Sequence, residues 1–301
     1  MKTAVNLCGV DFKNPIIAAS GTFGFGREYN EFYDVGVLGG ISSKGLTLLP
    51  REGNSGVRIA ETKSGILNCV GLQNPGVEAF IKNEIPFMRS TGAVVIANAA
   101  GSTLYDYEQI CERLSDADVD MVELNISCPN VKNGGMAFGV LPETVEEVTK
   151  VAKKRCKHPL IIKLTPNVAN IADNARAAEA GGADAVSLIN TLTGMAVDLY
   201  SRRPVLGNVT GGMSGPCVKP IALRMVRQVY KAINIPIIGL GGITSARDVL
   251  EFMLCGATAV QVGTANISDP YACYRIINDL TKEMQKCKIN DINEIIGKLL
   301  D

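Results

Sequence analysis

The sequence has no tryptophan, a single histidine and no formal net charge. Its 30 Lys and Arg residues balance 30 Asp and Glu residues. Phosphate backbones are bound by concentrated positive charge, so this balance argues against nucleic acid as the main partner. The longest apolar runs, such as residues 235–240, are far shorter than the ~18 residues that a membrane-spanning helix needs. The composition therefore predicts a protein that binds neither nucleic acid nor a membrane.

The cysteines lack any pairing pattern. There are nine, an odd number, and no two are spaced as Cys-x-x-Cys. The first residues, Met1 to Asn6, include no apolar segment of the kind that directs secretion. In a chain without an export signal, scattered cysteines are typical of reduced thiols in the cytoplasm. We therefore expect a cytoplasmic protein without disulfides and without a metal or iron–sulfur site of its own.

Short apolar segments alternate with amphipathic segments along most of the chain. Most of the apolar segments are hydrophobic at both alternating positions, which is typical of strands buried on both faces. The alternation predicts an α/β fold, a (β/α)8 TIM barrel that spans residues 1–301 as a single domain. The predicted strands are 15–20, 39–44, 94–99, 121–127, 159–165, 185–190, 235–239 and 259–263. The predicted helices are 74–89, 103–115, 142–156, 171–180, 220–232 and 245–254.

Further segments lie outside this repeating pattern. Residues 5–7 and 10–12 predict a small N-terminal β-hairpin that covers the barrel floor. The connections 45–73 and 192–215 are unusually long, and long loops in compact domains are usually functional. The first contains a second hairpin-like pair, and the second is rich in glycine and polar residues. We expect both long loops to lie over the active site.

Side-chain amides follow several of the predicted strands. In β/α barrels the catalytic groups gather at the carboxyl ends of the strands, which is where this sequence places Asn98, Asn125 and Asn190. Because amides both donate and accept hydrogen bonds, a ring of them suits a planar ligand with N–H and C=O groups. Gly241-Gly242 and Gly263-Thr264 follow the last two strands, which is the common phosphate site of such barrels. These residues predict a ligand that combines a planar polar ring with a phosphate.

Two ionisable side chains are expected inside the barrel. Lys163 lies within an apolar strand, where a buried amine is costly unless a negative group meets it. Glu123, on the adjacent strand, has the right parity to face Lys163. A flavin ring whose N1–C2=O edge gains negative charge on reduction would also suit this amine. The side chain could instead extend towards the strand end.

Cys128 is the candidate catalytic residue. It directly follows the fourth predicted strand, near Asn125, and precedes Pro129, which favours extended backbone at the preceding residue. The single histidine, His158, comes before the fifth strand, at the wrong end of the barrel for catalysis. The usual general base is therefore missing, and the Cys128 thiol is the best remaining titratable candidate near the rim.

The segment Asn125-Ile126-Ser127-Cys128-Pro129-Asn130 resembles the catalytic loop of the class 1 dihydroorotate dehydrogenases, FMN enzymes of pyrimidine biosynthesis. The resemblance extends over essentially the whole chain, and residues 20–26, Ser-Gly-Thr-Phe-Gly-Phe-Gly, are similar to the NAD-linked class 1B in particular. It implies that Cys128 is the base. It implies that FMN is held by Ser20, Lys44, Gly45, Asn98, Asn125, Lys163, Ile189, Gly215, Gly241, Gly242, Gly263 and Thr264. It implies that dihydroorotate is held by Lys44, Asn68, Cys69, Val70, Gly71, Leu72, Asn125, Asn190 and Thr191.

The resemblance also implies the reaction and the partners. Dihydroorotate would be oxidised to orotate, with Cys128 removing the proton from C5 and N5 of FMN accepting the hydride from C6. Electrons would pass to NAD through an electron-transfer subunit that carries FAD and a 2Fe-2S iron–sulfur cluster. This chain would form a homodimer within a heterotetramer.

Other functions remain open at this point. A fumarate-linked class 1A dihydroorotate dehydrogenase would share the barrel and the cysteine. Dihydropyrimidine dehydrogenase has a similar Ser-Cys-Pro core but is a far larger chain, with cluster-binding cysteines that this sequence lacks. A non-redox lyase or isomerase could use the two glycine pairs for a substrate phosphate, and such a protein would be colourless.

Overall fold

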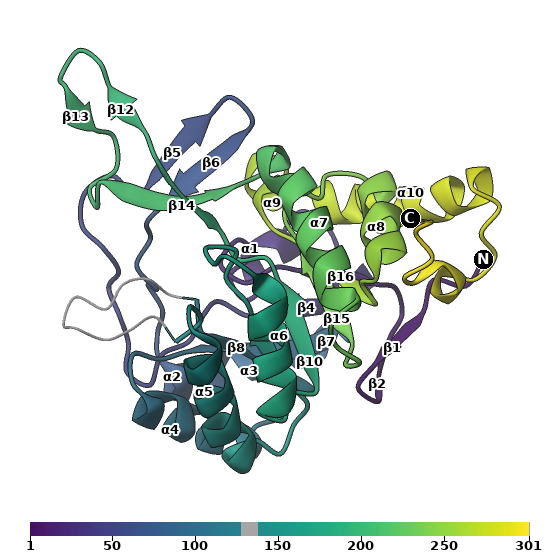
Figure 1. The fold of residues 1–301 in the computed structure, drawn as a ribbon, viewed down its shortest axis with the longest axis horizontal. Helices are drawn as coiled ribbons and strands as arrows, with labels where there is room; N and C mark the ends of the chain where they lie inside the picture. Colours follow the sequence, from purple (N-terminus) through teal and green to yellow (C-terminus); the bar gives the residue numbers. More distant parts are fainter. Residues whose placement is uncertain (128–137, 301) are drawn as a thin grey trace.

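Parallel strands close into a barrel in the computed structural model, which describes residues 1–127 and 138–300 (Figure 1). Closure is complete, because the eighth barrel strand pairs with the first and the sixth pairs with the seventh. The eight barrel strands confirm the predicted TIM barrel, with each strand beginning and ending within a few residues of its predicted range. They are β3 (Ile16–Ala18), β4 (Gly40–Ser42), β7 (Val94–Ala100), β8 (Met121–Asn125), β9 (Leu160–Lys163), β10 (Ala185–Leu188), β15 (Ile237–Leu240) and β16 (Ala259–Val262).

Helices surround the barrel, and three of the long ones begin at a side-chain cap. Thr103 and Ser245 form capping boxes with the aspartates three residues later, and these caps begin α4 (Leu104–Ser115) and α8 (Ala246–Cys255). The other long helices are α5 (Pro142–Arg155), α6 (Ile171–Ala180), α7 (Lys219–Tyr230) and α10 (Ala272–Lys286). Shorter helical segments are α1 (Arg27–Asn30), α9 (Thr264–Ser268), η1 (Val35–Val37), η3 (Pro216–Val218) and η4 (Ile292–Ile295). The sequence interpretation included neither α9 nor α10.

The helix predicted over 74–89 is irregular. It consists of α2 (Val77–Ala79), the π-helical segment η2 (Phe80–Glu84) and α3 (Ile85–Ser90). It begins later than predicted because Gly76, at its N-cap, has a positive φ of 85° that does not continue a helix. Pro86 has no N–H to donate, so the regular ladder cannot pass through it, and the wider segment lies immediately before it.

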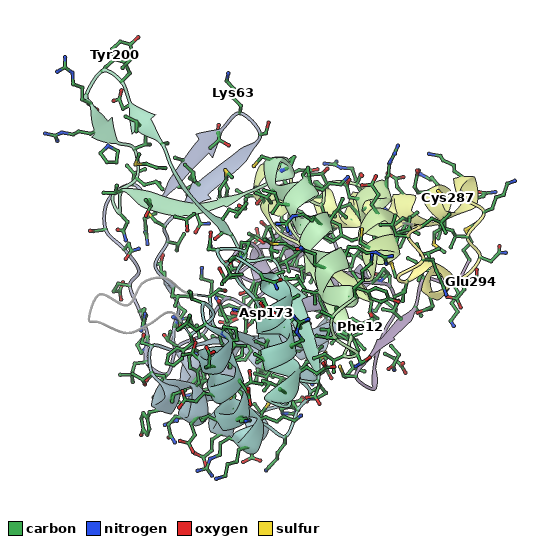
Figure 2. All side chains as sticks on the ribbon, in the orientation of Figure 1. Phe12, Lys63, Asp173, Tyr200, Cys287 and Glu294 are labelled. Atoms are coloured by element: carbon green, nitrogen blue, oxygen red, sulfur yellow. The ribbon has the colours of Figure 1, made fainter. Side chains whose placement is uncertain are left out.

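The N-terminal hairpin lies at the amino ends of the barrel strands, as predicted. Its strands β1 (Val5–Leu7) and β2 (Val10–Phe12) pair antiparallel. Phe12 is buried, and a Cβ on Gly40 of β4 would lie 3.0 Å from its ring (Figure 2 labels Phe12). Cys8, in the hairpin turn, donates from Sγ to the carbonyl oxygen of Asp184, one residue before β10. The hairpin therefore closes the end of the barrel opposite to the strand ends that carry the amides.

The two long connections meet in a second sheet, of which the sequence predicted only the hairpin-like pair within 45–73. β5 (Ile59–Thr62) and β6 (Gly65–Asn68) pair with β14 (Thr210–Ser214) and β11 (Leu192–Met195) in the order β11-β14-β6-β5. The expected loop 192–215 therefore contains strands. β12 (Val197–Asp198) and β13 (Arg203–Pro204) form a separate hairpin, whose tip residue Tyr200 is 95% exposed (Figure 2). Among the residues of the two described ranges, no helix is both long enough and apolar enough to cross a membrane.

Candidate active site

A cavity of about 400 Å³ lies between the carboxyl ends of the barrel strands and the second sheet. Its described lining includes two amines, Lys44 and Lys163, and no carboxylate. Burial lowers the pKa of Lys44, and the nearby charge of Arg58 lowers it further. No side chain in the described part of the chain forms an ion pair or hydrogen bond with the Lys44 amine. The cavity is therefore suited to an anionic or strongly polar ligand.

The structure brings the predicted ligand-binding residues together around this cavity. All of the residues expected to hold dihydroorotate line it. All of the residues expected to hold FMN line it as well, except Asn98. Cys128, the expected base, lies outside the described residues. Asn125 and Ser127, which precede it in the sequence, line the cavity.

Asn98 lies behind the wall of the cavity. It is fully buried, and its Nδ2 donates to Glu123 Oε2 at 2.6 Å. A carboxylate only accepts hydrogen bonds, so this contact fixes which end of the amide faces away from Glu123. Within residues 1–127 and 138–300, no donor reaches Asn98 Oδ1. A Cβ on Gly45, which does line the cavity, would lie 3.1 Å from that oxygen.

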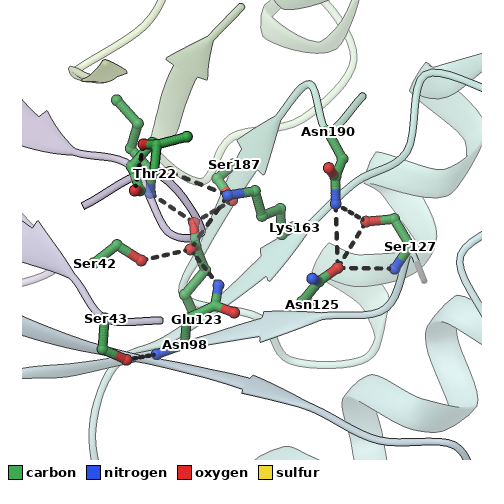
Figure 3. Close-up of polar contacts among 12 residues, drawn as sticks. Thr22, Ser42, Ser43, Asn98, Glu123, Asn125, Ser127, Lys163, Ser187 and Asn190 are labelled. Carbon is green, nitrogen blue, oxygen red and sulfur yellow. Dashed lines mark hydrogen bonds and ion pairs between the residues drawn. The ribbon is translucent and has the colours of Figure 1, made fainter. Parts of the chain in front are cut away.

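Glu123 lies at the centre of a buried polar network inside the barrel (Figure 3). Its Oε1 accepts hydrogen bonds from Ser187 Oγ and Gln261 Nε2, both at 2.7 Å. Its Oε2 accepts from Ser42 Oγ at 2.9 Å and from Asn98. Lys163 Nζ lies 3.6 Å from Oε2, which confirms the prediction that Glu123 faces Lys163.

The network keeps this carboxylate ionised. Burial by itself raises the pKa of Glu123, but the charge of Lys163 and the hydrogen bonds from Ser187, Gln261 and Ser42 lower it below its usual value. Sequence reasoning did not select Ser42, Ser187 or Gln261. Ser187 and Gln261 are polar residues with an apolar neighbour on each side in their strands, and Ser42 is the last residue of β4. This pattern marks the residues as unusual but does not indicate their partner. We call Ser42, Asn98, Glu123, Lys163, Ser187 and Gln261 the barrel network.

A second cluster joins the ends of β8 and β10. Asn190 Nδ2 donates to Ser127 Oγ at 2.6 Å and to Asn125 Oδ1 at 3.2 Å (Figure 3). Ser127 Oγ donates to the same Asn125 oxygen at 2.9 Å. With that oxygen occupied, Asn125 offers its Nδ2 donor, for which no described residue is an acceptor. Neutral donors therefore lie beside the segment that leads to Cys128.

Glycines give the cavity a wall of bare backbone at β15. Gly241 and Gly242 have φ values of 127° and 76°, which residues with side chains rarely adopt. A Cβ on Gly242 would lie 2.8 Å from the carbonyl oxygen of Gly215, so a side chain has no room there. Together with Gly263 and Thr264 these residues leave backbone exposed to the cavity, as an anion site requires.

Comparison with known proteins identifies the family. The family model described as "Dihydroorotate dehydrogenase" matches residues 2–284. This chain belongs to the dihydroorotate dehydrogenase family. It is 56% identical over 295 residues to "Dihydroorotate dehydrogenase B (NAD(+)), catalytic subunit" of Alkaliphilus oremlandii, and the alignment covers 98% of each chain. Proteins of the same name from Alkaliphilus metalliredigens and Petrotoga mobilis are 55% and 52% identical, each over 98% of both chains.

In this member of the dihydroorotate dehydrogenase family, Asp248 supports the loop that carries Gly241 and Gly242. Its carboxylate accepts hydrogen bonds from the N–H groups of Thr244 and Ser245 at 2.8 and 2.9 Å. Lys219, which begins α7, pairs with Asp248 and also with Glu251 at 2.6 Å. Burial by itself raises the pKa of Asp248, but the bonds from Lys219, Thr244 and Ser245 lower it overall. Asp248 therefore ties the glycine loop to α7 and α8.

Replacing Asp248 with asparagine is expected to lower the free energy of unfolding by about 1–3 kcal/mol, the range for hydrogen bonds to a buried charge. Because the folded-state pKa is depressed, this stabilisation is present above the unfolded pKa of ~3.9 and is lost as the pH falls through the folded value. Urea unfolding at pH 7 and at decreasing pH measures both effects. Glu251→Gln, which alters the more exposed partner of Lys219, is the control and should cost less than about 1 kcal/mol. Equal losses in the two variants would contradict the role given to Asp248.

Proposed function

We propose that this chain is the FMN-binding catalytic subunit of an NAD-linked dihydroorotate dehydrogenase, acting as a single barrel domain over residues 1–301. It would oxidise dihydroorotate to orotate in de novo pyrimidine biosynthesis. The observation that carries this proposal is the described lining of the cavity, which combines two amines, clustered amides and a glycine wall without a carboxylate. Relatives with that printed name, 52–56% identical over nearly their whole length, support it.

The residues present fit FMN. Asn98 Oδ1, a buried acceptor without a described donor, would accept a hydrogen bond from the ring, and Lys163 would interact with its most electron-rich edge. Backbone N–H groups of Gly241, Gly242, Gly263 and Thr264 would hold the phosphate. Ser20, Lys44, Gly45, Asn125, Ile189 and Gly215 would complete the site. When bound, FMN supplies the two-electron oxidation by taking a hydride from C6 of the substrate at N5.

The remaining residues would hold the substrate and move its proton. Lys44 would bind the carboxylate of dihydroorotate, since it is an amine of the cavity without a described partner. Asn125, Asn190, Thr191 and the segment 68–72 would read the N–H and C=O groups of the ring. Cys128 would remove the proton from C5. The second sheet would limit the access of water, because β6 and β14 carry part of the cavity lining.

A direct test is the colour of the protein. We expect purified protein to show the flavin absorption bands, with one FMN per chain, and to bleach when dihydroorotate is added without oxygen. Dihydrouracil, which lacks the carboxylate that Lys44 would bind, is the matched control and should bleach it far less. A colourless protein that does not take up FMN would refute the proposal and would favour a non-redox barrel enzyme. Preferential bleaching by dihydrouracil would favour a dihydropyrimidine dehydrogenase activity.

We further infer that the chain acts in the cytoplasm and passes its electrons to a separate subunit that carries FAD and a 2Fe-2S cluster. The phrase "catalytic subunit" in the names of the relatives supports a separate partner. Among the described residues, no group of His, Cys, Asp and Glu is arranged to hold a metal ion. A homodimer of this chain within a heterotetramer is the assembly that we expect.

A further inference from the structure

Glu123 is a fully buried carboxylate that neither lines the cavity nor takes part in the proposed reaction. Both of its oxygens accept two hydrogen bonds each from neutral side chains of the barrel network. These donors come from four other strands, β4, β7, β10 and β16. A carboxylate that is anchored on all sides has one position only, so any charge that it balances is held in a fixed place.

Glu123 pairs with the positively charged amine of Lys163. Its amine donates to Gln261 Oε1 at 3.2 Å and lies 3.6 Å from Glu123 Oε2. Gln261 is a bridge, because its Nε2 donates to Glu123 while its oxygen accepts from Lys163. An ammonium has three donors, and Lys163 lines the cavity, so donor capacity remains for a ligand.

We propose that Glu123 is a positioning residue that fixes the amine of Lys163 at the cavity wall and balances its charge. Because the Lys163–Glu123 ion pair has no net charge, Lys163 offers FMN an oriented N–H donor without an unbalanced positive charge. The site therefore binds reduced FMN only moderately more tightly than oxidised FMN. This inference rests on the proposed function, because its readout is bound FMN.

Among the residues that the structure describes, no other group near Lys163 could play this part. Glu123 is the only carboxylate at ion-pair distance from Lys163 in the described part of the chain. The other titratable side chains that line the described cavity are Lys44 and Cys69. Lys44 carries the same sign as Lys163 and cannot balance it. Without Glu123, Lys163 would be an unbalanced cation beside a ligand that becomes more negative on reduction.

A double-mutant cycle on bound FMN tests the proposal. Its members are the parent, Glu123→Gln, Lys163→Met and the double variant, and the readout is the midpoint potential of the bound FMN at one fixed pH. We expect Glu123→Gln to raise the affinity for reduced relative to oxidised FMN by about tenfold, which is a rise of about 30 mV for a two-electron couple. With Met at 163 the same substitution should change the ratio by less than about twofold, because Glu123 acts through Lys163.

Two further variants separate charge from packing. Ser187→Ala removes one neutral donor from Glu123 and changes no charge. The ratio of its affinities for reduced and oxidised FMN should therefore stay within about twofold of the parental ratio. Glu123→Asp keeps the charge but withdraws it from Lys163, so it should produce a smaller rise, and it carries the test if Glu123→Gln does not fold. No change in either Glu123 variant, a fall in potential, or equal rises with and without Lys163 would overturn the inference. Failure of the parent chain to bind FMN would instead refute the proposed function.

Discussion

Replacement of Cys128 by alanine should slow the reduction of bound FMN by dihydroorotate by roughly 10²–10⁴-fold, the usual contribution of a positioned general base. FMN should remain bound, because no residue of the proposed phosphate cradle is changed. Cys128 is selected because it directly follows Ser127 in the chain. Ser127 and Asn125 line the cavity, and both accept a hydrogen bond from Asn190 Nδ2. Anaerobic stopped-flow absorbance at saturating dihydroorotate measures the rate.

Other thiol variants separate catalysis from a general effect of losing a cysteine. Cys217, which follows the cavity residues Ser214 and Gly215, is the matched control, and Cys217→Ala should reduce FMN within about twofold of the parental rate. Cys128→Ser should be slow at neutral pH, because a hydroxyl is a much weaker acid than a thiol, which has a free pKa of ~8.5. A parental rate in Cys128→Ala would remove the role from Cys128. If Cys69→Ala then lost the activity, the base would be Cys69, which lines the described cavity.

The barrel could be predicted from sequence because its signals are local. Each strand is a short apolar segment, and some of the predicted helices begin at caps, such as Thr103 and Ser245. The approach of Glu123 to Lys163 was also predictable. Residues of matching parity on adjacent parallel strands point to the same side of a sheet, and a buried amine needs a negative partner. These inferences need no knowledge of distant contacts.

The second sheet could not be predicted because it depends on pairing between distant segments. Asn68 of β6 pairs with Gly212 of β14, although they are far apart in sequence and β14 begins Thr-Gly-Gly, which has little intrinsic strand propensity. The need for the glycines of β14 is apparent only from the folded structure. A Cβ on Gly211 would lie 2.6 Å from the carbonyl oxygen of Asn68 and would prevent the pairing.

The barrel network was hidden for a related reason. Ser42, Ser187 and Gln261 are unremarkable residues in their own strands, and their function depends on converging at Glu123. Asn98 shows the same limit. Its position at a strand end predicted a ligand contact, but only the structure shows that its nitrogen is committed to Glu123 and that its oxygen faces Gly45. The role of Cys128 remains a prediction, since it lies outside the described residues.

The isolated chain should reduce neither NAD nor fumarate efficiently. Addition of the electron-transfer subunit should raise the rate of NAD reduction by about two orders of magnitude or more, because it supplies the missing component of the reaction. The first strand is not followed by a G-x-G-x-x-G dinucleotide motif, and the cysteines have no spacing for an iron–sulfur cluster. In the described ranges no residues are grouped to hold a metal either. In the proposed function the electrons leave through the partner subunit, so the isolated chain should reduce its own FMN rapidly but turn over slowly.

Two measurements on the same preparation test this expectation. Single-turnover bleaching by dihydroorotate should be fast with or without the partner, because it depends only on the cavity of this chain. Steady-state NAD reduction should appear only with the partner, and Cys128→Ala should abolish it by slowing the first step while leaving the partner's own NADH–dye activity intact. Efficient turnover of the isolated chain with fumarate would instead identify a fumarate-linked class 1A enzyme. That result would require the segment Phe23-Gly24-Phe25-Gly26 to occur outside the NAD-linked class, and it would leave the assignments of Cys128 and the FMN site unchanged.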